Sequence, residues 1–117
     1  MRIHALVAAS LLMLAASPLA ADVRGDAKQQ LEFGIAVAQR GLWREAIYRW
    51  ERAAEIDPTY AAAHNNLAIA YEHEGDLPKA RASYEKALEL EPNNALIKQN
   101  YELFREINDR TTRKDAK

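Results

Sequence analysis

The side chains most able to do chemistry in this sequence are histidines, and His64 and His73 are the two that lie beyond residue 21. They stand nine residues apart in a segment with helical periodicity. At about 100° per residue, this spacing places them on opposite faces of one helix. A single helix therefore cannot present both rings to the same metal ion. We expect His64 to pack between helices and His73, beside Glu72 and Glu74, to be solvated.

Combinations typical of an enzyme do not occur in the sequence. It shows no Ser/His/Asp set, no paired carboxylates in a plausible cleft, no glycine-rich phosphate loop and no metal-ligand spacing. The absence of cysteine excludes thiol chemistry and disulfides. A net charge of −1, with both signs interspersed, argues against a nucleic-acid binder. We expect a protein that is not an enzyme and that binds no metal, no cofactor and no nucleic acid.

The elements that must position any site repeat with a period of 34 residues. Residues 27–60 align with residues 61–94 without a gap, and nine of the aligned pairs are identical. Among them are the pairs Gly41/Gly75, Ala46/Ala80, Ala53/Ala87 and Pro58/Pro92. A fixed period of about 20 to 50 residues indicates stacked supersecondary units. Such stacks usually present surfaces to partners rather than catalytic centres.

Helical periodicity and helix-end signals predict five helices, over residues 27–40, 43–55, 60–73, 77–91 and 95–108. Asp26 and Asp76 are the expected N-caps, and Gly41 and Gly75 the expected helix ends. Pro58 and Pro92 should set the turns between repeats, because proline cannot continue a helix.

Large and small side chains alternate in a way that suits packed helix pairs. Trp50 and Tyr84, one period apart, are expected to fill the space between neighbouring helices. Residues 22–26 should form a polar lead. Residues 109–117 have no apolar side chain larger than alanine, so we expect a disordered tail.

Residues 1–21 have the features of a secretory signal peptide. A basic start is followed by an apolar stretch over residues 5–16 and by small residues at Ala20 and Ala21. As a helix this stretch would span about 18 Å, well short of a hydrocarbon core about 30 Å thick. We expect cleavage after Ala20 or Ala21 and export to a periplasm. An uncleaved signal acting as a membrane anchor is the alternative.

The second repeat resembles the tetratricopeptide repeat. The residues that carry the resemblance are Asn66-Leu67-Ala68, Ala70-Tyr71, Gly75-Asp76, Ala80, Tyr84, Ala87-Leu88-Glu89-Leu90 and Pro92-Asn93-Asn94. The first repeat matches less well, since Val37 stands where the second has Tyr71, and the third unit departs after its first helix. The resemblance implies an all-α solenoid of two helix hairpins, 27–60 and 61–94, closed by a capping helix over 95–108.

In the tetratricopeptide family, the first helix of each repeat lines a concave groove that receives a peptide or a partner helix. The resemblance implies that the groove residues are Leu31, Ile35, Ala38, Asn65, Asn66, Ile69, Glu72, His73, Gln99, Leu103 and Glu106. Their mixture of an apolar stripe and an acidic edge would suit an apolar or mildly basic segment. A clamp for a terminal carboxylate, known in chaperone-binding members, is not expected because its cations are missing.

The function predicted in this way is that of an exported adaptor that binds a protein or peptide in its groove. The alternative is a structural subunit or homo-oligomer of a cell-envelope assembly, which would use the stacking surfaces instead. Self-association is compatible with both, and the identity of the partner stays open.

Overall fold

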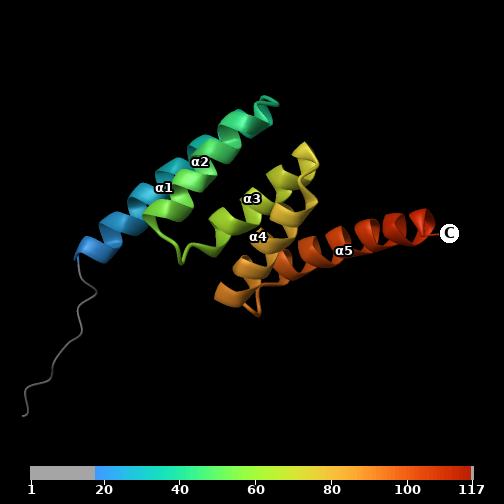
Figure 1. Ribbon diagram of the computed structural model, residues 1–117. Helices are drawn as coiled ribbons and strands as arrows, with labels where there is room; N and C mark the ends of the chain where they lie inside the picture. The colour runs from blue at the N-terminus through green and yellow to red at the C-terminus, as the bar shows by residue number, and fades with distance from the viewer. Residues whose placement is uncertain (1–17, 117) are drawn as a thin grey trace, which may run out of the picture.

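Five helices follow one another along the chain in the computed structural model, which describes residues 18–116 and the side chains of residues 22–110 and 112–116. They are α1 (Pro18–Gln39), α2 (Trp43–Ile56), α3 (Ala61–Glu74), α4 (Leu77–Leu90) and α5 (Ala95–Asp115). The first two form one antiparallel hairpin and the next two form a second, which packs on the first (Figure 1). The predicted all-α solenoid of two hairpins and a C-terminal helix is confirmed.

Helix boundaries that depend on a local signal lie where the sequence predicts them. Gly41 and Gly75 each have φ of 79°, the left-handed conformation that glycine adopts most readily after a helix. Asp76 caps α4, and its carboxylate accepts a hydrogen bond of 3.2 Å from the backbone N–H of Lys79. Asn94 caps α5 in the same way, with a bond of 3.2 Å from the N–H of Ile97.

The first helix begins at Pro18 rather than at Ala27, so Asp26 lies inside α1 and is not its N-cap. The polar lead is therefore helical. Gly25 does not interrupt it, because one glycine inside a helix costs only about 1 kcal/mol relative to alanine. The expected signal peptide falls mainly on residues 1–17, which lie outside the described residues.

Arg24, in this early part of α1, has a tertiary partner. Its guanidinium forms an ion pair with Asp57 in the turn between α2 and α3, and lies 4.5 Å from the ring centroid of Tyr60. These contacts tie the start of the helix to the junction between the repeats. Among the described residues, no helix is both long enough and apolar enough to cross a membrane.

The last helix is longer than predicted, since α5 runs to Asp115 and includes most of the expected disordered tail. Its far half extends beyond the other helices (Figure 1). Contacts one turn apart support it there, namely the ion pair of Arg110 with Glu106 and the 3.0 Å hydrogen bond from the Thr112 hydroxyl to the carbonyl of Asn108. Local helical contacts thus order a segment that lacks apolar anchors.

Trp50 and Tyr84 occupy the core as predicted, with 4% and 1% of their surfaces exposed. The indole N–H of Trp50 donates a hydrogen bond of 3.0 Å to the backbone carbonyl of Leu31 in α1. Alanines that are fully buried flank both rings and let the helices approach closely.

Neighbouring repeats are also linked by two hydrogen bonds of the same kind. The Tyr71 hydroxyl of α3 donates to the Glu51 carboxylate of α2 over 2.7 Å. The Tyr101 hydroxyl of α5 donates to the Glu85 carboxylate of α4 over 2.9 Å. Because Glu51 and Glu85 are one period apart, each second helix holds the next first helix through the same acceptor.

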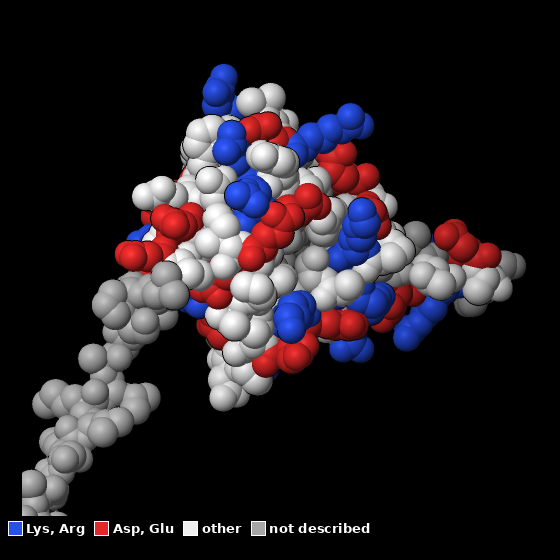
Figure 2. All heavy atoms as spheres, turned by 60° about the vertical axis from the view of Figure 1, so that its left-hand side comes forward, with Lys and Arg blue, Asp and Glu red and all other residues white. Residues whose placement is uncertain are grey.

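Charged side chains of both signs are interspersed on the surface that Figure 2 shows, without an extended patch of one sign. Several are paired along single helices, as Glu45 is with Arg49 and Lys86 with Glu89. Exposed pairs of this kind contribute little to stability, typically below about 1 kcal/mol each.

Candidate functional site

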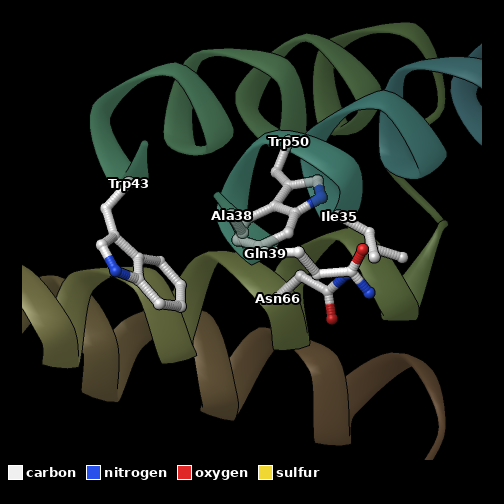
Figure 3. Close-up of a pocket in the computed structure, with 6 residues that line it drawn as sticks. All are labelled: Ile35, Ala38, Gln39, Trp43, Trp50 and Asn66. Carbon is white, nitrogen blue, oxygen red and sulfur yellow. The ribbon is translucent and has the colours of Figure 1, made fainter. Parts of the chain in front are cut away.

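Two cavities lie between the first helices of successive units. The first has a volume of about 280 Å³ and is lined by Ile35, Ala38, Gln39, Trp43, Trp50 and Asn66. Figure 3 shows Trp43 and Trp50 reaching from α2 toward α3, where Asn66 lies. The second cavity has a volume of about 250 Å³ and is lined by Ile69, Glu72, Tyr84, Asn100, Leu103, Phe104 and Ile107.

The two cavities are the same hollow repeated. Four pairs of lining residues are one 34-residue period apart, namely Ile35/Ile69, Ala38/Glu72, Trp50/Tyr84 and Asn66/Asn100. In each cavity the isoleucine forms an apolar wall, the large ring comes from the second helix of the unit, and the asparagine comes from the next unit. The fold therefore presents one cavity shape twice along the face formed by α1, α3 and α5.

Six of the predicted groove residues line these cavities. The first cavity contains Ile35, Ala38 and Asn66, and the second contains Ile69, Glu72 and Leu103. Ile35 is 38% exposed and Leu103 is 56% exposed, so both are accessible from solvent.

Two other predicted groove residues are buried, which corrects their assignment to an open surface. Leu31 packs in the core below Trp50. The carboxamide of Asn65 accepts a hydrogen bond of 3.2 Å from Asn100 of α5, so it joins two helices. Both side chains therefore face neighbouring helices and not the solvent.

The last three predicted groove residues are exposed but lie outside both cavity linings. His73 is not simply solvated, because its ring stacks on Trp43 with the centroids 4.1 Å apart. Glu106 is paired with Arg110 on its own helix. Gln99 lies on the exposed side of α5.

The second cavity contains a carboxylate where the first has a methyl group. Burial raises the pKa of Glu72, and a hydrogen bond with the Tyr84 hydroxyl opposes part of that rise. Burial and the neighbouring Glu72 charge also raise the pKa of Tyr84. In the part of the chain that the structure describes, no ion pair involves Glu72. This carboxylate thus faces an apolar cavity without a cation.

The histidines do not form a metal site with each other. The His64 ring nitrogen Nε2 lies 3.0 Å from the carbonyl oxygen of Pro58, so His64 is tied to the turn before α3. Within the described residues, no group of three His, Asp or Glu side chains could hold a metal ion.

Three cavity residues that the sequence predictions missed follow a periodic signal. Gln39 lies one period before His73 and Ile107 one period after it. Of these three equivalent positions, only His73 was predicted to be a groove residue. Asn100 is one period after Asn66. The period could have found these residues, whereas Trp43 and Phe104 have no equivalents in the linings and require the structure.

Family profiles match most of the repeated region. A profile described as "Tetratricopeptide repeat" matches residues 61–94, and one described as "TPR repeat" matches residues 34–75. The two matches overlap and together run from Gly34 to Asn94, which includes the end of α1 and all of α2, α3 and α4.

Relatives with known names share parts of the chain. A type IV pilus assembly protein, PilF of Pseudomonas aeruginosa, is 33% identical over 87 residues, which is 73% of this chain and 34% of that protein. The protein O-mannosyl-transferase TMTC4 of Mus musculus is 37% identical over 65 residues, 56% of this chain and 9% of that protein. The chain thus spans about a third or less of these relatives' length. The repeated hairpins, the family profiles and these relatives show that the chain belongs to the tetratricopeptide repeat family.

Proposed function

We propose that this chain is a protein-interaction module that binds a peptide or partner helix along the face formed by α1, α3 and α5. The repeated cavity supports the proposal, since it offers the same apolar hollow twice in a line. Repeats of this family generally serve protein binding rather than catalysis, and the proposed role is not enzymatic.

The helices that line the groove are held by core packing, so the receptor would lose little conformational freedom on binding. A specific interface commonly buries about 800 Å² per partner. An interface of that size would use most of the face that contains the two cavities. The expected affinity is modest, and a second contact or self-association would strengthen it.

The setting that we propose is the cell envelope, reached by export through the predicted signal peptide, with a periplasm as the compartment. The apolar stretch and the small residues before residue 22 support export. The similarity to a relative named as a type IV pilus assembly protein supports a role within an envelope assembly. Western blotting of cell fractions would test the compartment. Mass spectrometry of the purified protein would test whether the signal peptide has been removed.

Photo-crosslinking in cells tests groove binding directly. A photoreactive residue at Ile35 or Ile69 should capture one and the same partner, because both line the groove. Tyr48, which is 55% exposed on α2, provides the control position and should not capture that partner. Capture of only a second copy of this chain would reject the adaptor and favour the homo-oligomeric alternative.

A further inference from the structure

The two cavities differ in one respect that decides what each can receive. Where Ala38 contributes a methyl group to the lining of the first cavity, Glu72 contributes a carboxylate to the lining of the second. The remaining walls are similar, since each has an isoleucine, a large ring and an asparagine. Of the differences between the two linings, this exchange is the one that changes their charge.

The first cavity offers no charge to a ligand. The indole N–H of Trp50, one of its lining residues, is already bonded to the carbonyl of Leu31. The other polar groups of its lining are the carboxamides of Gln39 and Asn66 and the indole N–H of Trp43, all uncharged. Such a site is suited to an apolar side chain, because entry would remove apolar surface from water without leaving a buried polar group unpaired.

The second cavity combines a carboxylate with apolar walls. Ile69, Leu103 and Phe104 form those walls. Arg81 of α4, whose guanidinium lies over the Phe104 ring, is paired with Asp109 at 4.0 Å. The Glu72 carboxylate keeps one donor, the Tyr84 hydroxyl, and has acceptor capacity to spare.

Lysine and arginine match this combination. Their aliphatic stems lie along apolar walls while the charged head reaches a polar group. A charge-assisted hydrogen bond to a partly buried carboxylate is stronger than one between neutral groups. An acidic ligand group would meet repulsion from Glu72, and an apolar one would leave the carboxylate desolvated without a partner.

We propose, on the basis of the groove binding proposed above, that the second cavity is a subsite for a lysine or arginine of the partner and the first cavity a subsite for an apolar side chain. The groove thereby selects a segment that carries both in a fixed order. Helices packed through side chains lie about 10 Å apart, which an extended chain spans in about three residues.

Synthetic nine-residue peptides test the proposal on the full chain, with binding followed by NMR chemical shifts. Each peptide has leucine at its fourth residue and lysine, arginine, norleucine or glutamate at its seventh. The lysine and arginine peptides should shift the amides of Glu72 and Leu103 and bind at least about tenfold more tightly than the norleucine peptide. The glutamate peptide should bind most weakly.

Variants assign the effect to one carboxylate. Glu72→Gln keeps an acceptor for Tyr84 and should remove the preference for lysine over norleucine. Glu72→Ala gives the second cavity the same residue that Ala38 provides in the first, and it should make the norleucine peptide bind more tightly than the lysine peptide. Glu106→Gln, which removes the same charge from an exposed residue of α5 outside both cavity linings, is the matched control and should leave the preference for lysine unchanged.

The outcomes separate the two proposals. Equal binding of the lysine and norleucine peptides in the groove would overturn the cationic subsite and leave groove binding standing. A preference that survives in Glu72→Gln would also overturn it. If no peptide binds along this face at millimolar concentration, both proposals fail.

Discussion

Gly34 lies so close to Trp50 that a β carbon at residue 34 would be 2.3 Å from the indole Nε1. No real β carbon makes such a contact, so the ring or the helix would have to move. In the second repeat the equivalent pair is Ala68 and Tyr84, in which a larger helix residue faces a smaller ring. The combined size of the two side chains is thus similar in the two repeats, although both residues differ.

Gly34→Ala should destabilise the protein by about 1–3 kcal/mol, because it overpacks a filled core. Urea unfolding followed by tryptophan fluorescence would measure the change. Gly25→Ala is the matched control in the same helix, since nothing lies within 4 Å of the added methyl group. It should stabilise the protein by up to about 1 kcal/mol. A smaller ring should relieve the clash, so adding Trp50→Tyr to Gly34→Ala should lose less stability than the two single changes summed.

Asp57→Asn should remove a pH-dependent part of the stability. The Thr59 hydroxyl bond, opposed by burial and aided by Arg24, holds the pKa of Asp57 below its ordinary 3.8. A lowered folded-state pKa stabilises the protein above about pH 4 and ceases to do so as pH falls through that lower value. Urea unfolding should show the variant about 1 kcal/mol less stable at pH 7, with a difference that shrinks as the pH falls below 4. A constant difference across this range would contradict the prediction, and Asp26→Asn is the exposed control.

Tyr71→Phe should weaken the contact between the two repeats. Its hydroxyl donates to Glu51 at the surface, where a hydrogen bond contributes about 0.5–1 kcal/mol. A double-mutant cycle with Glu51→Gln would isolate the pair from other effects of each change. Tyr101→Phe with Glu85→Gln should give a coupling energy of similar size, because the two hydrogen bonds are similar in length and both lie at the surface. Coupling energies near zero for both pairs would show that packing alone joins the units.

The end of α5 provides a test that needs no substitution. Residues 109–115 should show the carbon chemical shifts of a helix in NMR spectra of the full chain. Replacing Asn108 by glycine should lower those helical shifts locally, since it removes its carboxamide bond to the Phe104 carbonyl and adds backbone freedom. Random-coil shifts beyond Asn108 in the unaltered chain would contradict the helix.

Features with a local cause could be predicted from sequence, and features set by helix rotation could not. Gly75 and Asp76 mark a helix end and a helix start through their own backbone and side-chain chemistry. Leu31 has the same apolar character as Ile35, yet one turn of the helix separates a buried residue from an exposed one. Which of the two residues is buried depends on which side of α1 faces Trp50, and the local sequence pattern does not show this.

The early start of α1 and the long α5 escaped prediction for a related reason. Asp26 is a favourable N-cap residue, but the helix gains more from continuing, since Arg24 then reaches Asp57 some thirty residues along the chain. The pairing of Asn65 with Asn100 also depends on distant residues. The 34-residue period places equivalent residues in line, but it does not say which neighbours will touch.

A stack of identical units is symmetric under a shift of one unit, so a ligand moved along it by one repeat would meet an unchanged wall. The exchange of Ala38 for Glu72 removes this translational symmetry. A ligand that distinguishes the two cavities can then bind in only one register and with its chain running in only one direction across α1, α3 and α5. Two units are enough for this, because one difference between neighbours already defines an origin and a sense.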